Sequence, residues 1–243
     1  MNFKSNFAAQ ESAFRTSIWA ALVCVVFCVG CTESGLSGYK IPGLSKQGSP
    51  ESEPTDRDEL PPKENAKACM IAAEKLQNSG HGDQAILLYE KARRNDPDLK
   101  TVAHPLAVLY DELGDSTKSL VEFRLAIEAE PKSADVYSDL GYYYMKRGNL
   151  HDAETQLRKA IELDPKHQRA LNNLGMVLAD QGRYGDSFET FSKAVGPAAA
   201  HSNLGVLMAK QGRVEDARKE FHAALALDAS LKQPQAFLAY LDR

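Results

Sequence analysis

The sequence has few cysteines, and they are unevenly placed. Of its 4 cysteines, Cys24, Cys28 and Cys31 lie close together near the N-terminus, and only Cys69 stands apart. This distribution excludes a small fold held together by disulfides. Cys69 falls within an expected helix, where we interpret it as a small buried hydrophobic residue.

The sequence also lacks an apolar run long enough to cross a bilayer near its start. Lys4 and Arg15 precede an apolar run of 12 residues from Ile18 to Val29. As a helix this run would extend about 18 Å, short of the roughly 30 Å hydrocarbon core of a membrane. A charged start followed by a short apolar run predicts an export signal that is cleaved, here residues 1–30.

The end of this expected signal resembles that of a bacterial lipoprotein. Val29, Gly30 and Cys31 are similar to the motif whose cysteine receives lipid and becomes the mature N-terminus, although Cys28 stands where leucine is usual. The resemblance implies lipidation of Cys31 and attachment to the bacterial cell envelope. Thr32, in place of an aspartate, implies the periplasmic face of the outer membrane. A generic signal peptide or an uncleaved anchor is the alternative.

No strong excess of either charge is present. The formal net charge is −4, and removal of residues 1–30, with Lys4, Glu11 and Arg15, would leave about −5. This balance favours solubility and gives no support for nucleic-acid binding. Residues 31–65 are rich in serine, glycine, proline and glutamate, so we expect a flexible tether with a root-mean-square reach of about 30 Å.

The remainder of the sequence repeats. Gly80, Gly114, Gly148 and Gly182 are spaced 34 residues apart, and Gly212 follows after 30. Each glycine supplies the backbone freedom of a tight turn between two antiparallel helices. Three prolines that cannot continue a helix close the first units: Pro97, Pro131 and Pro165.

Small and large residues alternate around these glycines in a fixed register. The small residues that precede each glycine by seven positions are Ala73, Ala107, Gly141, Gly175 and Gly205. The large residues that follow each glycine by nine positions are Tyr89, Phe123, Leu157, Phe191 and Phe221. A small residue lets two helices approach closely, and a large one fills the adjoining space. The pattern predicts helical hairpins that bury their apolar faces by stacking.

This register resembles that of tetratricopeptide-repeat proteins. The resemblance implies an all-α fold, a right-handed superhelix of five helical hairpins followed by a C-terminal capping helix. The expected units are residues 66–99, 100–133, 134–167, 168–197 and 198–231, with the cap at 232–243. Phe237, Leu238 and Leu241 would cover the open apolar end of the stack.

The fourth expected unit is short. Ala160 precedes Gly175 by 15 residues, but Ala194 precedes Gly205 by only 11. Four residues is about one helical turn, so we expect the second helix of this unit to be one turn shorter. Either the shortening is neutral, or it widens a groove at this joint.

Two prolines bear on helix ends. We expect Gly196-Pro197 to stop the second helix of the fourth unit, as Asp164-Pro165 stops that of the third. Pro105 lies inside an expected helix, and a helix start near Val102 or Ala103 would place it harmlessly in the first turn.

The sequence offers little for catalysis. The 6 histidines are scattered through the units, and we interpret His151 and Glu154, on one helix face, as a solvated ion pair. No glycine-rich phosphate loop and no nucleophile–base constellation is recognisable. We therefore expect no enzymatic activity, no cofactor, no metal and no small-molecule substrate.

A binding surface is expected instead. In tetratricopeptide arrays the first helix of each hairpin lines a concave groove, which implies eight groove residues here: Asp139, Tyr142, Asn172, Asn173, Met176, Ser202, Asn203 and Val206. Asparagines in such slots can hydrogen-bond the backbone of an extended peptide. The alternative is that they are ordinary surface residues.

The layout of lipid, tether and short array resembles the tetratricopeptide lipoproteins of pilus and secretion systems. The segment 194–207 is similar to those of the tight-adherence pilus type. Our hypothesis is a non-catalytic protein-interaction scaffold at the bacterial envelope that assists assembly of a pilus or secretion complex. The alternatives are a pilotin-like carrier of a secretin, or an accessory or regulatory subunit of an envelope enzyme that acts on the cell wall.

Overall fold

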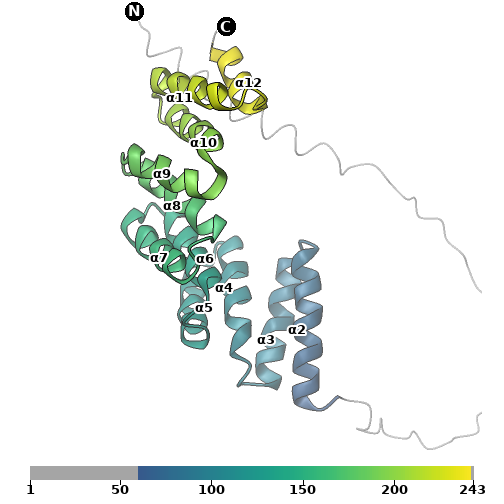
Figure 1. Ribbon diagram of the computed structural model, residues 1–243. Coiled ribbons are helices and arrows are strands. Elements are labelled where there is room, and N and C mark those ends of the chain that lie inside the picture. Colours follow the sequence, from purple (N-terminus) through teal and green to yellow (C-terminus); the bar gives the residue numbers. More distant parts are fainter. Residues whose placement is uncertain (1–59, 242–243) are drawn as a thin grey trace, which may run out of the picture. The chain divides into compact units, whose positions relative to one another are not determined.

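The computed structural model describes residues 60–241, so the expected signal, Cys31 and most of the expected tether lie outside the described residues (Figure 1). The helices in chain order are α2 (Pro62–Asn78), α3 (Gly82–Asn95), the 3-10 turn η1 (Lys100–Val102), α4 (Ala103–Glu112), α5 (Ser116–Ala129), α6 (Ala134–Lys146), α7 (Leu150–Leu163), α8 (Gln168–Asp180), α9 (Tyr184–Val195), α10 (Pro197–Lys210), α11 (Val214–Leu227) and α12 (Lys232–Leu241). Within residues 60–241, none of these helices is both long and apolar enough to cross a membrane.

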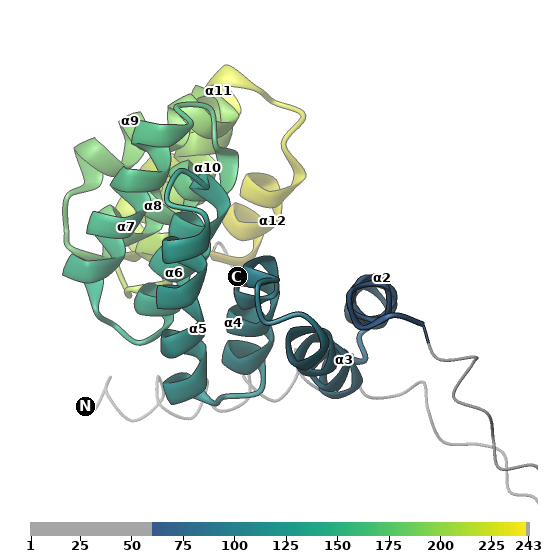
Figure 2. The same ribbon diagram turned by 90° about the horizontal axis from the view of Figure 1, so that it is seen from below.

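Consecutive helices pair and the pairs stack in chain order, as Figures 1 and 2 show. The pairs are α2/α3, α4/α5, α6/α7, α8/α9 and α10/α11, and α12 packs on the last pair. On α12, Leu238 is buried and the ring of Phe237 stacks on Phe221 at 5.0 Å. The predicted all-α solenoid with a capping helix is confirmed.

The turn inside each pair depends on a left-handed residue. The five turn glycines have φ between 75° and 82°, a region that residues with a Cβ atom rarely adopt; they are Gly80, Gly114, Gly148, Gly182 and Gly212. The glycines predicted to form the turns therefore do so.

The small residues lie where two helices of a pair touch. A Cβ atom added to Gly175 would come within 2.7 Å of the Phe191 ring, and one added to Gly205 would come equally close to Phe221. In the fourth pair the Ser187 hydroxyl also donates to the Gly175 carbonyl at 2.7 Å. Each pair is thus fixed by one close backbone approach.

Two helix starts depend on prolines. Pro105 is the third residue of α4, which begins at Ala103 as predicted. By contrast, α2 begins at Pro62, before residue 66 where the first unit was expected. Pro62 occupies the first helical position, where a fixed φ and a missing N–H favour a helix start.

The shortened fourth unit differs from the expectation. α9 has 12 residues and α7 has 14, so α9 is two residues shorter and not a full turn. Most of the deletion falls in the connection, because Gly196 is the only residue between α9 and α10. As predicted, α9 ends directly before Gly196-Pro197, just as α7 ends directly before Asp164-Pro165, and Pro197 is also the first residue of α10.

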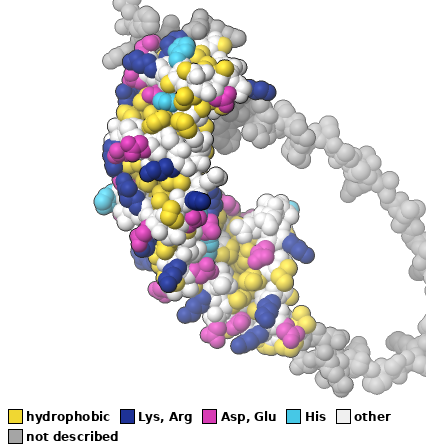
Figure 3. Space-filling model, viewed as in Figure 1, with side chains coloured by type: hydrophobic (Ala, Val, Ile, Leu, Met, Phe, Trp, Pro, Cys, Tyr) yellow, Lys and Arg dark blue, Asp and Glu magenta, His cyan; other side chains and the backbone are white. Residues whose placement is uncertain are grey.

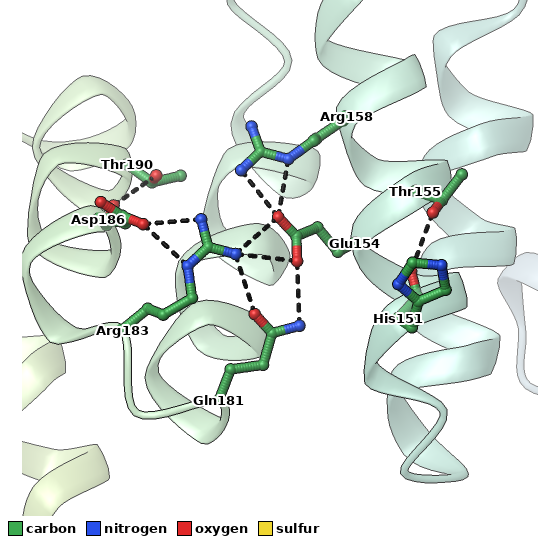
Figure 4. A network of polar contacts seen from close by, with 8 residues as sticks. All are labelled: His151, Glu154, Thr155, Arg158, Gln181, Arg183, Asp186 and Thr190. Atoms are coloured by element: carbon green, nitrogen blue, oxygen red, sulfur yellow. Dashed lines mark hydrogen bonds and ion pairs between the residues drawn. The ribbon is translucent and has the colours of Figure 1, made fainter.

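A polar network joins the third pair to the fourth (Figure 4). Glu154 on α7 accepts hydrogen bonds from Arg158 at 2.8 Å, Gln181 at 3.0 Å and Arg183 at 2.9 Å. Arg183 in turn pairs with Asp186 on α9. Burial alone would raise the pKa of Glu154, but these donors outweigh it and lower the pKa to about 2.

The close approach at Gly175 can be tested by filling it. Gly175→Ala should lower the free energy of unfolding by about 1–3 kcal/mol, because the added Cβ atom would come within 2.7 Å of the Phe191 ring. Gly185→Ala on α9 is the matched control, since its Cβ would meet nothing within 4 Å. That variant should be unchanged or gain up to about 1 kcal/mol. Equal behaviour of the two variants in urea titrations would contradict the packing described.

The network at Glu154 predicts a pH-dependent contribution. Because the pKa of Glu154 lies below its ordinary value of 4.5 in the folded chain, its contribution is present above that pH and is lost as the pH falls towards 2. Glu154→Gln should lower the free energy of unfolding by about 1–3 kcal/mol at pH 7, and the deficit should shrink by pH 3.

Glu162→Gln on the same helix is the control for this measurement. Glu162 is 68% exposed and pairs only with Lys159 of its own helix. Its loss should cost less than about 0.5 kcal/mol. Urea titrations at several pH values would measure the free energy of unfolding of both variants. A deficit for Glu154→Gln that does not change with pH would be inconsistent with the ionised network.

Candidate functional site

A cavity of about 220 Å³ opens between the fourth and fifth pairs, and we call it the α8–α10 groove. Its lining residues are Asn172 and Met176 of α8, Phe191 and Val195 of α9, Asn203, Val206, Leu207 and Lys210 of α10, and Gln233 of α12. The first helices of two adjacent pairs thus form its walls, α9 contributes between them, and the capping helix adds one side chain.

Four of the eight predicted groove residues line this cavity: Asn172, Met176, Asn203 and Val206. They come from two helices that are separate in the sequence, and the stacking of the pairs brings them together. Half of the predicted side chains thus share one cavity, and their role in peptide binding stays a prediction.

The other four predicted residues lie elsewhere. Asp139 is half-buried and pairs with His104 at 2.9 Å and with Arg169 at 3.1 Å. Tyr142 is exposed under the ammonium of Lys146, 5.3 Å from the ring centroid. The ion pairs with His104 and Arg169 already occupy the Asp139 carboxylate.

Asn173 and Ser202 also differ from the expectation. Asn173 is half-buried and does not line the cavity, so the structure brings Asn172 and Asn203 together in place of the expected Asn173 and Asn203. Ser202 is buried and donates to Gln233 at 3.3 Å. The expectation assumed a uniform stack, and the single-residue connection at Gly196 breaks that uniformity.

Asn172 carries an unsatisfied hydrogen-bond acceptor. Its Oδ1 atom is buried and has no hydrogen-bond partner within the described chain. Ser138 has the equivalent position on α6, and its Oγ atom is also buried without a partner there. A buried acceptor without a donor is costly, so a ligand N–H at Asn172 would be favoured.

The lining of the groove is mainly apolar, and its charged side chain is positive. Met176, Phe191 and Val206 provide apolar surface, and Val195 is 42% exposed. Lys210 is the one charged residue in the lining. This composition suits a ligand with apolar side chains and backbone N–H groups.

Several lining residues were not predicted. Phe191 and Val195 belong to a second helix, which the sequence register assigns to packing between helices. Gln233 lies at the start of α12. The signal that could have found them is the Gly196-Pro197 connection, because a joint without a linker leaves the end of α9 next to α10.

Among residues 60–241, no three histidine, cysteine or acidic side chains are grouped as a metal site would require. On the face drawn in Figure 3, basic and acidic side chains are interspersed, without a continuous basic surface. A protein or peptide ligand is therefore the chemistry that the geometry supports best.

Comparisons with known proteins agree with this fold. Two family models described as tetratricopeptide repeat match residues 138–203 and 198–230. A search of curated proteins gave no match. The solved structure of MamA is similar with a TM-score of 0.56 and 23% identity, over 67% of this chain and 91% of MamA.

Two further solved structures have the same helical arrangement. YrrB, described as a TPR protein with an unusual peptide-binding site, has a TM-score of 0.55 and 22% identity over 72% of this chain and 92% of its own. PilW, described as a widely conserved type IV pilus biogenesis factor, has a TM-score of 0.56 and 22% identity over 69% of this chain and 79% of its own. At these identities the likeness shows the fold, and the family matches identify tetratricopeptide repeats within residues 138–230.

Proposed function

We propose that this protein is a non-catalytic interaction scaffold at the bacterial envelope, and that the α8–α10 groove binds an extended segment of a protein partner. The observation that carries the proposal is the buried Asn172 Oδ1 atom, which has no hydrogen-bond partner among the described residues and lies in a mainly apolar cavity. A peptide backbone presents N–H donors at regular intervals, and its side chains can bury apolar surface at the same time.

The two asparagines fit such a ligand. Asn172 and Asn203 come from different helices and face one cavity, so one peptide can contact both. Each amide offers donors and an acceptor, which matches the alternating groups of a backbone. Met176 and Val206 then provide apolar contacts beside these hydrogen bonds.

The envelope assignment is supported by the sequence pattern at residues 18–31. The structural likeness to PilW, a pilus biogenesis factor, supports the narrower proposal of a role in assembling a pilus or secretion complex. In this account lipid on Cys31 holds the protein at the membrane, and residues 31–61 connect the lipid to α2.

The groove can be tested by photo-crosslinking in cells. A benzoylphenylalanine placed at Met176 should crosslink an envelope protein, whereas the same group at the exposed Glu189 of α9 should not give that product. Asn172→Ala together with Asn203→Ala should reduce the Met176 crosslink, since each lost hydrogen bond costs about 1 kcal/mol, or about 5-fold in affinity.

Asn173→Ala is the matched control for the groove. It makes the same change at the neighbouring position, which does not line the cavity. It should leave the crosslink unchanged, and circular dichroism should show all variants folded. Equal loss in the control and the double variant would rule out the specific role of Asn172 and Asn203.

Lipid attachment is tested separately. The wild-type protein should incorporate a fatty-acid analogue and sediment with membranes, because acyl chains partition into the bilayer. Cys31→Ser should abolish both properties, and Cys28→Ser should retain them. An unlabelled wild-type protein, or labelling that survives Cys31→Ser, would refute the lipid anchor.

A further inference from the structure

A second cavity, of about 460 Å³, lies beside α7 and α9, and we call it the α7–α9 cleft. Its apolar lining is Ile161 of α7, Pro165 and the buried Leu171 and Leu174 of α8. Leu171 and Leu174 project from a different face of α8 than Asn172 and Met176, which line the α8–α10 groove. The two cavities are therefore separate sites.

Two side chains that line the cleft are shorter than their counterparts in the two adjacent units. Leu171 occupies the repeat position held by Tyr137 in the third unit and by His201 in the fifth. Thr190 lines the cleft from α9 at a position held by Gln156 and Glu220 in those neighbouring units. The Thr190 hydroxyl donates to the Asp186 carbonyl of its own helix at 2.7 Å.

In both neighbouring units a ring occupies the corresponding position. The Tyr137 hydroxyl reaches the carbonyl of Pro131, which is the counterpart of Pro165, at 3.4 Å. In the fifth unit the His201 ring contacts the Glu220 carboxylate at 2.7 Å. The fourth unit alone of these three lacks the ring, so its cleft has the size and apolar character to hold one from another molecule.

The rim of the cleft carries one available cation. Lys193 of α9 is exposed and forms no ion pair with any residue between 60 and 241. By contrast, Arg158 on the rim is held by Glu154, as Figure 4 shows, and Glu162 on the rim is held by Lys159 at 2.9 Å. A carboxylate entering with a ring would meet Lys193 as its free partner.

We propose that the α7–α9 cleft is a second docking site, which takes an aromatic side chain with an adjoining carboxylate from a protein partner. The ring replaces what Tyr137 and His201 supply in the neighbouring units, and the carboxylate pairs with Lys193. The site goes beyond the proposed groove, because a ligand here leaves Asn172 and Asn203 accessible.

N-acetyl-phenylalanine and its neutral amide are the probes for this site. Titrated into the 15N-labelled protein, both should shift the backbone amide signals of Ile161, Thr190 and Lys193 saturably at millimolar concentration. The carboxylate form should bind about 2- to 5-fold more tightly than the amide, as expected for an exposed ion pair. Lys193→Met should remove this difference.

Filling the cleft with the residues of neighbouring units should block the probes. Leu171→Tyr introduces the residue that the third unit has at this position. Thr190→Gln likewise introduces the third unit's glutamine, Gln156. Each should weaken binding by about 10-fold or more, with helix content unchanged by circular dichroism. Asn172→Ala, in the other cavity, should leave the titration unchanged.

The result that would overturn the docking site is either the absence of saturable shifts around the cleft in the wild type or full binding by folded Thr190→Gln. Equal affinity for acid and amide would overturn the carboxylate part. Since neither Asn172 nor Asn203 lines the α7–α9 cleft, failure of this titration leaves the α8–α10 groove standing, and failure of the groove leaves this site standing.

Discussion

The close approach of two helices at a small residue is the constraint on which the rest of the structure depends. Where Gly175 faces Phe191, even one added methyl group would clash. That contact sets the position of α8 against α9, and the turn glycine Gly182 allows the chain to reverse between them. Because each pair buries its remaining apolar surface only on its neighbours, the position of each pair depends on the geometry of the pairs next to it.

The joint at Gly196 shows how a small departure from that regularity builds a site. A single residue connects α9 to α10, where four residues connect α7 to α8. Phe191 and Val195 of α9 consequently line a cavity together with side chains of α8 and α10. The α7–α9 cleft, which Leu171 and Thr190 line, also adjoins the fourth unit. Both candidate sites therefore lie at the unit that breaks the repeat.

Much of the fold could be predicted from the sequence because the determinants repeat. The turn glycines, the small residues and the aromatic residues opposite them act through local geometry, and each unit reports the same geometry independently. Pro105 could be placed in the first turn of α4 for the same reason, since proline has a fixed φ. The length of α9 could not be predicted, because a repeat that is four residues short does not indicate whether the helix or the connection has lost them.

The site was only half predictable. Repeat register indicates which residues share a position, but not how two neighbouring pairs rotate against each other at an irregular joint. The register therefore predicted both Asn172 and Asn173 in the groove, whereas only Asn172 lines the cavity. Ion pairs between units also cannot be read from the register. Asp139 pairs with His104 and Arg169, which lie on the first helices of the preceding and following pairs. Gln233 enters the groove only because the capping helix docks beside α10.

The central claim is that the irregular joint creates the binding groove, and restoring the regular joint tests it most directly. Replacing Gly196-Pro197 by residues 162–167 of the third unit would return the fourth unit to the 34-residue period. The account predicts that this variant keeps its helix content, because the new connection already joins α7 to α8, and that it no longer crosslinks a partner from position 176. A folded variant that captures the same partner as efficiently as the wild type would contradict the account.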